Sequence, residues 1–284
     1  MTWTLTASLD EFRAEAGAFL AAHPAQNTVL LTIADRLARN GPQVFGTEPP
    51  RFGWWRPEPD GPVTGVYLQT PPYPPRLGVM PTEAGAALAD ALHARTPAPT
   101  GISGTKPAAL AFAERWQALT GATAAHLLRD ERLYRLDRLT PPDPAPAGHV
   151  RTAGPGDREL LIRWFGAFAT EVGIDRHADL GAQADRWIAE GSSHLWEDGG
   201  RPVSLAGAGP VVAGMSRIGP VYTPPELRAR GYAAAVVAAA SAHAIAAGAG
   251  EVLLYTDLAN PTSNSLYQRL GYRPVEDSVV LSLH

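Results

Sequence analysis

Hydrophobic positions in the second half of the chain follow first a helical and then a strand-like period. Apolar residues recur at helical spacing between Leu160 and Val172, and a second helix is predicted over Leu180–Glu190. Further on, an Ala-rich stretch that stops at Gly248 predicts a long helix, and a short helix is predicted over Thr262–Leu270. The predicted strands are His194–Glu197, Val203–Ala208, Met215–Thr223, Glu251–Asp257 and Val279–Leu283. The predicted order is therefore α-α-β-β-β-α-β-α-β.

The first half repeats part of this order. Its predicted helices are Asp10–Ala22, Thr28–Arg39, Thr82–His93 and Ala108–Leu119. Its predicted strands are Val44–Phe45, Arg51–Arg56, Val63–Gln69, Arg76–Met80, Gly101–Ser103 and Leu133–Leu136. Residue identity between the halves is low, so the repeat is one of element order.

A proline-rich segment separates the two halves. Thr140–Gly148 reads TPPDPAPAG, and four prolines in nine residues allow neither a helix interior nor a central strand. Such a segment is typical of a semi-rigid linker. We therefore expect domains at residues 1–139 and 150–284, joined by a linker at 140–149. The fold class is α/β (α+β), with a mixed central sheet flanked by helices in each domain.

Composition and charge exclude several classes of protein. The net charge of -4 and the absence of any basic run argue against a nucleic-acid binder, because such proteins neutralise phosphates with clustered Lys and Arg. The chain has no cysteine, which excludes disulfides, thiolate metal sites and thiol catalysis. Its histidines do not pair at metal-ligand spacing, so we expect no metal site.

Targeting and membrane signals are weak. The first residues, Met1–Glu15, lack the basic-then-apolar pattern of a signal peptide. The most apolar window, Tyr232–Gly250, is mostly alanine and contains His243, which favours a buried helix over a membrane span. We expect a cytoplasmic protein without a membrane segment.

The candidate chemistry begins in the run Arg228–Ala233, between a predicted strand and the long helix. A helix N-terminus presents unpaired N–H groups and a partial positive charge, which suit a pyrophosphate. Gly231 and Ala233 let the backbone approach an anion, while Arg228 and Arg230 add charge. The alternative is an ordinary strand-to-helix turn with surface arginines. Thr223–Glu226 also has the spacing of a capping box, which predicts a helical turn from Pro224.

A second motif follows about 27 residues later, and together the two resemble the signatures of the GNAT superfamily of N-acetyltransferases. The first signature has Arg or Gln, two residues, Gly, any residue, then Gly or Ala, as in Arg228–Ala233. In the second, Asn, a small residue and Tyr precede a Gly-aromatic pair. Here these positions are held by Asn260, Ser263, Tyr267 and Gly271-Tyr272. The resemblance covers roughly residues 150–284, and the predicted element order is that of the family.

The resemblance implies an acetyl-CoA site. Tyr267 would protonate the departing thiolate as a general acid. In the family two parallel strands splay apart around the acyl group, here Met215–Thr223 and Glu251–Asp257. The implied cofactor-binding residues are Val221, Tyr222 and Thr223 for the pantetheine arm, Arg228, Ala229, Arg230, Gly231, Tyr232, Ala233 and Ala234 for the pyrophosphate, and Asn260, Ser263, Asn264 and Tyr267 for the rest of coenzyme A. Asn260 also has the position of a helix N-cap, and Tyr267 could instead be a packed helix aromatic.

The general base is less clearly marked. Many relatives carry a glutamate on the strand before the anion loop, where this chain has Ser216 and Arg217. Glu171, at the end of the first helix of the second half, is the leading candidate, since these helices border the acceptor site in the family. Asp257 and Glu197 are weaker candidates, and a water relay to a distant base is an equal alternative.

The first half resembles a degenerate second copy of the same fold. Its counterpart of the anion loop is Met80–Gly85, which has no arginine and places Glu83 where a phosphate would sit. We therefore predict that this half does not bind coenzyme A. It would cover the acceptor pocket or build an interface, so a homodimer is compatible with the sequence.

Three functions are consistent with these motifs. The leading one is transfer of an acetyl group from acetyl-CoA to a primary amine of a small molecule, by direct attack in a ternary complex. The second uses a larger acyl-CoA, and the third is a non-catalytic acyl-CoA sensor. The acidic chain suits a small amine acceptor better than a nucleic acid, while the acceptor itself has no transferable sequence code.

Overall fold

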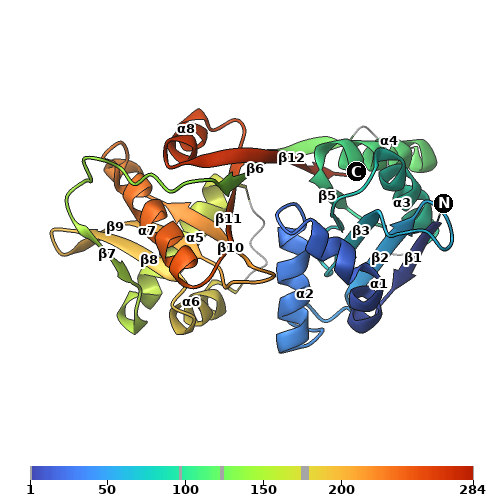
Figure 1. Ribbon diagram of the computed structural model, residues 1–284, viewed down its shortest axis with the longest axis horizontal. Helices are drawn as coiled ribbons and strands as arrows, with labels where there is room; N and C mark the ends of the chain where they lie inside the picture. The colour runs from blue at the N-terminus through green and yellow to red at the C-terminus, as the bar shows by residue number, and fades with distance from the viewer. Residues whose placement is uncertain (1, 96–97, 122–124, 174–178, 284) are drawn as a thin grey trace. The chain divides into compact units, whose positions relative to one another are not determined.

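The structure is a computed structural model that describes residues 2–95, 98–121, 125–173 and 179–283 (Figure 1). It divides into two compact units. The first consists of Met1–Leu133, Asp257–Ala259 and Val275–His284, and the second of Tyr134–Thr256 and Asn260–Pro274. The proline-rich segment 140–149 thus lies inside the second unit, and the last residues of the chain lie in the first.

The first unit has a sheet covered by helices on both faces. Its strand order is β1-β2-β3-β4-β5-β12, and only β4 and β5 are parallel. The elements are β1 (Thr2–Thr6), α1 (Leu9–Ala22), α2 (Thr28–Asn40), β2 (Arg51–Arg56), β3 (Gly65–Gln69), β4 (Arg76–Leu77), α3 (Thr82–His93), β5 (Gly101–Thr105), α4 (Lys106–Thr120) and the second half of β12 (Tyr272–Ser282).

Strand alternation assigns these helices to faces. Side chains of successive strand residues point to opposite sides of a sheet. Val66 and Leu68 therefore pack with residues of α1 and α2, whereas Tyr67 between them packs with residues of α3 and α4. The same alternation separates Trp54, in the α1–α2 core, from Trp55, whose ring lies 5.8 Å from that of Trp3.

One predicted strand of the first unit is wrong, and one strand was missed. Val44–Phe45 forms turns instead of a strand, with the Val44 N–H bonded to Gly41 O and the Gly46 N–H to Gln43 O. These apolar residues pack onto the α1–α2 core from a loop, which burial alone does not distinguish from a strand. Conversely β1 was not expected, because its Thr-rich edge sequence shows little apolar signal.

The elements predicted between Leu160 and Leu270 are present in the second unit in the predicted order, but strand His149–Thr152 was not predicted and the predicted last strand, Val279–Leu283, lies in the first unit. Its sheet runs β6-β11-β10-β9-β8-β7, with β10 and β11 parallel. The elements are β6 (His126–Leu136), whose last residues belong here, β7 (His149–Thr152), η1 (Pro155–Asp157), α5 (Arg158–Glu171), α6 (Leu180–Ala189), β8 (Ser193–Asp198), β9 (Arg201–Ala208), β10 (Met215–Tyr222), η2 (Pro225–Leu227), α7 (Tyr232–Ala246), β11 (Glu251–Asp257) and α8 (Pro261–Arg269). The Asp198-Gly199-Gly200 hairpin turn is confirmed, with positive φ at both glycines.

Two separate cores cover the sheet of the second unit. Leu205 on β9 packs with α5 and α6, whereas its neighbours Ala206 and Ala208 pack with α7 and α8. The mixed sheet flanked by helices confirms the predicted α/β class in both units. In the described residues no helix has the length and hydropathy needed to cross a bilayer.

Candidate acyl-CoA site

The parallel strands β10 and β11 pair only where they begin. The register joins Met215 to Glu251, Ser216 to Val252 and Arg217 to Leu253. Among the described residues no pairing continues beyond Arg217 on this side. On its other side β10 stays paired with β9 as far as Tyr222. The two parallel strands therefore separate toward their C-terminal ends, as the sequence resemblance implied.

A β-bulge accounts for the separation. Between Ile218 and Val221 the pairing with β9 advances from Ala208 to Ala206, so β10 has one extra residue. The bulge contains Gly219, whose φ of 147° lies where a side chain is strained, and Pro220, which has no N–H to offer β11. The bulged strand bends, and this re-aims the end of β10 away from β11.

Side chains hold the end of β10 against β9. The Ser204 hydroxyl lies 3.3 Å from the Tyr222 carbonyl oxygen and 2.7 Å from Thr223 Oγ1. Thr223 therefore does not form the predicted capping box, since its hydroxyl bonds to β9 and the turn that follows has no side-chain cap. The helical turn itself is present, as η2. The buried Ser216 donates to the Gly209 carbonyl oxygen at 2.7 Å.

The loop between β10 and α7 presents a row of backbone donors. Ala229 and Gly231 have positive φ values of 60° and 84°, and Gly231 is the N-cap residue of α7 without a side-chain cap. Among hydrogen bonds between described residues, none uses the N–H groups of Ala229 through Ala234, and the first helical bond runs from Ala235 N to Gly231 O. Consecutive free N–H groups at a helix N-terminus form a cradle for an anion.

The side chains of the two arginines in this loop turn back onto the protein. Arg228 donates from Nε to the Thr223 carbonyl oxygen at 3.0 Å and from Nη2 to Glu171 Oε1 at 2.6 Å. Arg230 Nη2 donates to the Glu226 carbonyl oxygen at 3.1 Å. Both arginines thus brace the loop while adding positive charge beside its free N–H groups.

Two contacts that the sequence did not reveal support the start of α7. The Tyr232 hydroxyl donates to Asp198 Oδ2 at 2.5 Å, which ties the helix to the β8–β9 turn. This bond and burial raise the pKa of Tyr232. Pro146 lies against Gly231, with its ring atoms 3.6–3.8 Å from where a Gly231 Cβ would be. The segment around Pro146 is held by the Trp196 indole, which donates to the Ala147 carbonyl oxygen at 2.9 Å.

The second motif forms the start of α8. Asn260 is the N-cap, and its Oδ1 accepts from the Ser263 N–H at 3.0 Å, which confirms the alternative of a helix cap. Asn264 donates from Nδ2 to the Asn260 carbonyl oxygen and accepts from the Tyr134 hydroxyl at 2.9 Å. Tyr134 comes from β6, 130 positions earlier, so no local pattern could have pointed to it.

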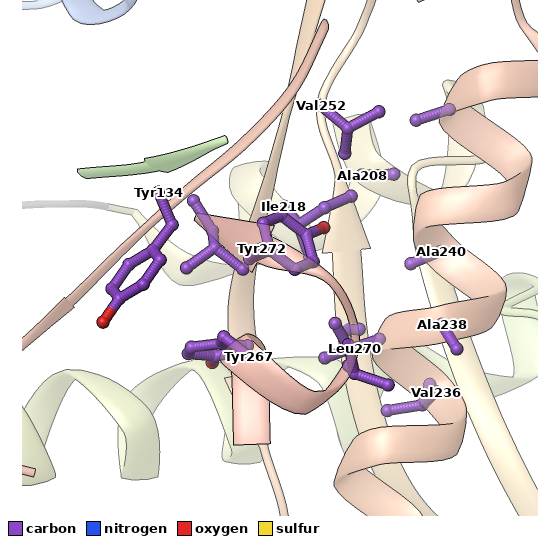
Figure 2. Close-up of a cluster of buried hydrophobic side chains, with 14 of the residues drawn as sticks. Tyr134, Ala208, Ile218, Val236, Ala238, Ala240, Val252, Tyr267, Leu270 and Tyr272 are labelled. Atoms are coloured by element: carbon purple, nitrogen blue, oxygen red, sulfur yellow. The ribbon is translucent and has the colours of Figure 1, made fainter. Parts of the chain in front are cut away.

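Tyr267, on α8, is a buried phenol in the core that residues of the sheet, α7 and α8 form together (Figure 2). Its ring lies edge-on to that of Tyr272, with centroids 6.1 Å apart. Burial raises the pKa of Tyr267 to about 12, so the phenol keeps its proton at neutral pH. The Tyr272 hydroxyl is 2.7 Å from Ser241 Oγ, whereas that of Tyr267 has no hydrogen-bond partner in the described part of the chain. Tyr267 thus holds a proton that no neighbouring group accepts.

Glu171 lies beside the C-terminal end of β10. Its negative charge is one cause of the raised pKa of Tyr222, after burial. The Tyr222 ring packs at 5.8 Å from that of Trp164 on α5, the helix that ends at Glu171. The structure therefore places Glu171 near the strand end that the cradle follows. Glu197, by contrast, accepts from Arg151 at 2.6 Å, away from this strand.

No metal centre accompanies these residues. In the ranges that the structure describes, no three His, Cys, Asp or Glu side chains are grouped to hold an ion.

Part of the chain is similar to a known family. Residues 159–272 match the family model described as Acetyltransferase (GNAT) family. The chain matches no curated protein by sequence. Among solved structures it is similar to a GNAT acetyltransferase of Colwellia psychrerythraea, with 13% identity, a TM-score of 0.59 and coverage of 100% of this chain and 99% of that one.

Two further solved structures are similar over nearly the whole chain. One is a Drosophila protein with 14% identity, a TM-score of 0.66 and coverage of 99% and 98% of the two chains. The other is a GCN5-related N-acetyltransferase of Sphaerobacter thermophilus with 20% identity, a TM-score of 0.58 and coverage of 98% and 94%. At these identities the likeness shows the fold, and it includes the first unit as well as the second.

Proposed function

We propose that the second unit, whose residues 159–272 match the acetyltransferase (GNAT) family model, transfers an acetyl group from acetyl-CoA to a primary amine of a small molecule. The observation that carries this proposal is the row of free N–H groups from Ala229 to Ala234, at the end of a strand that separates from its parallel neighbour. The N–H row fits a pyrophosphate, and the separated strands fit an extended thioester arm that bonds like an added strand.

The proposal gives each predicted residue a task. The N–H groups and the arginines of the cradle hold the pyrophosphate, and Val221, Tyr222 and Thr223 hold the pantetheine arm. Residues Asn260, Ser263 and Asn264 contact the remainder of coenzyme A. The neutral amine attacks the thioester carbon directly, the nitrogen–carbon bond forms, and the carbon–sulfur bond breaks. Glu171 accepts the proton of the amine, and Tyr267 gives its proton to the leaving sulfur.

A pair of glycine variants tests the cofactor site. Gly231 and Gly248 stand at the two ends of α7 with φ values of 84° and 92°, so a side chain strains both backbones alike. We expect Gly231→Val to weaken coenzyme A binding by at least about 100-fold, which is about 2.7 kcal/mol, and Gly248→Val to leave it within about twofold. Titration calorimetry with coenzyme A measures both. Normal affinity in Gly231→Val, with a cooperative unfolding transition, would show that the cradle is elsewhere.

Thiol release in a screen of amines with acetyl-CoA then tests the reaction. Turnover with at least one primary amine supports acetyl transfer to a small acceptor. Tight binding of coenzyme A without turnover of acetyl-CoA by any amine would instead favour a sensor, and turnover only with longer acyl-CoA donors would favour a larger acyl group.

A further inference from the structure

The positive charge of Arg228, at the start of the cradle, is already paired with a carboxylate of the protein. Its Nη2 donates to Glu171 Oε1 at 2.6 Å, and its Nε donates to the Thr223 carbonyl oxygen at 3.0 Å. The guanidinium therefore links the end of α5 to the end of β10. Arg228 is the first residue of the Arg228–Ala233 motif, and the free N–H groups begin at the next residue.

This ion pair is weak enough to be exchanged. The side chains of Arg228 and Glu171 are 48% and 43% exposed, and ion pairs this open to water stabilise proteins little. A phosphate group offers the same guanidinium two parallel charge-assisted hydrogen bonds, which are stronger. A doubly charged pyrophosphate at the neighbouring N–H groups would thus compete for Arg228 with an advantage over the single carboxylate.

Besides Arg228, Glu171 also lies close to the end of β10. Its charge acts on Tyr222, the last residue of β10, at the point where β10 has left β11. A carboxylate released from Arg228 would remain beside this strand end, where the acyl gap of the proposed enzyme opens.

We propose that the Glu171–Arg228 ion pair is a latch that acyl-CoA opens: the pyrophosphate takes Arg228, and Glu171 becomes available to accept the proton of the amine. This inference rests on the proposed function of the site. It makes proton acceptance depend on acyl-CoA, because the carboxylate is held by Arg228 until acyl-CoA is present. In the reaction the amine proton moves to the freed carboxylate, while the leaving thiolate takes its proton from Tyr267, so charge and protons balance.

The test uses the full chain and one substitution that should strengthen coenzyme A binding while it slows turnover. Glu171→Gln keeps the size of the side chain and removes the charge that competes for Arg228. We expect this variant to bind coenzyme A about two- to fivefold more tightly, the range that a surface ion pair allows, and to turn over acetyl-CoA more slowly with the best amine. A residue that only supports the fold would weaken binding and turnover together when replaced.

Two further variants separate the latch from a general field effect. Glu226→Gln removes a carboxylate that lies in the same loop as Arg228 and forms no ion pair in the described part of the chain, and we expect less than half the gain of Glu171→Gln. In the Arg228→Gln background, Glu171→Gln should leave the affinity for coenzyme A unchanged, because no guanidinium remains to compete for.

The outcomes distinguish this inference from the proposed function. If wild type and all variants fail to bind coenzyme A, the proposed function is wrong and the latch falls with it. If wild type binds and turns over acetyl-CoA but Glu171→Gln has unchanged or weaker affinity, only the latch is wrong. A gain of equal size in Glu226→Gln, or in the Arg228→Gln background, also overturns it.

Discussion

The two units of this chain build the same junction, a strand followed by a helix, in opposite ways. Between β10 and α7 the six N–H groups from Ala229 to Ala234 are free of partners in the described structure. Between β4 and α3 the Gly78 N–H bonds to Val66 O and the Val79 N–H bonds to Asn27 Oδ1. Pro81, the N-cap of α3, has no N–H and accepts from Ala84 instead.

The parallel strand pairs beside these junctions also differ, because one pair separates and the other stays in contact. β10 and β11 separate after Arg217, whereas β4 and β5 stay in contact beyond their paired residues. A Cβ on Gly104 would lie 2.5 Å from Leu77 Cβ and 2.8 Å from Leu77 O, so nothing fits between these strands. One strand pair is open and continues into six consecutive free donors, and the other is closed and continues into a segment where bonded N–H groups and a proline interrupt the donors.

The contrast shows that two units of similar element order differ in strand separation and free donors through a few backbone positions. A bulge and two residues with positive φ open the second unit, whereas a proline and a tightly packed glycine close the first. These differences agree with our proposal that the first unit is a degenerate copy without coenzyme A.

The largest effect should come from Tyr267, which has a matched tyrosine in the first unit. Burial raises the pKa of both Tyr267 and Tyr67 to about 12. We expect Tyr267→Phe to lower kcat by about 10² to 10⁴, because it removes a general acid, and to leave affinity for coenzyme A within about twofold. Tyr67→Phe should leave kcat unchanged. Equal turnover of wild type and Tyr267→Phe in a thiol-release assay would contradict the acid role.

Two glycine substitutions test the difference between the closed pair β4–β5 and the open pair β10–β11. Gly104→Ala places a methyl group against Leu77 at a φ of 155°, and we expect a loss of about 2–4 kcal/mol in the free energy of unfolding of the first unit. Gly219→Ala meets nothing within 4 Å at a φ of 147°, so only backbone strain of about 1–2 kcal/mol opposes it.

Urea unfolding and the KM for acetyl-CoA measure these two effects. The comparison predicts that Gly104→Ala costs more stability, while Gly219→Ala raises the KM more, because its backbone lies in the bulge. The reverse ranking of the two variants in both measurements would mean that the strand pairs do not differ as described.

The sequence predicts most elements of the fold and both motifs of the site, because hydrophobic period and short motifs are local. The ends of β11 and α3 were placed to the residue. It does not predict Tyr134 beside Asn264, Asp198 at Tyr232 or Glu171 at Arg228, since each pair joins distant positions. β12 was expected only at its apolar end, because Arg273 and Glu276 break the alternation in its first half.

A pH-dependent difference between the units is the next effect in size. Burial lowers the pKa of His194, in the second unit, from 6.5 to about 4, with help from the charge of His243. Between pH 4 and pH 6.5, His194 is therefore protonated in the unfolded chain and neutral in the folded chain. Stability is complete above pH 6.5 and falls as the pH drops toward 4, by about 2 kcal/mol at pH 5.

In the first unit, the contribution of Glu276 to stability should change with pH in the opposite direction. Burial raises the pKa of Glu276, so its contribution to stability is present at low pH and is lost as the pH rises through the raised value. Hydrogen exchange read on peptides of each unit at pH 7 and pH 5 separates the two. After correction for the slower intrinsic exchange at pH 5, we expect lower protection at pH 5 in the second unit, and His194→Phe should remove most of that change. A pH response that persists in His194→Phe would assign it to other groups.

The smallest effect is expected from Glu83, the acidic residue in the first turn of α3. Removing its charge by Glu83→Gln should cost about 0.3–1 kcal/mol, because a carboxylate stabilises a helix N-terminus. If like-charge repulsion alone kept coenzyme A from the first unit, this variant would bind two molecules per chain. We expect titration calorimetry to give one, since the bonds of Gly78 and Val79 and the missing N–H of Pro81 interrupt the row of donors before α3. A second site in Glu83→Gln would show that charge, and not backbone geometry, separates the two units.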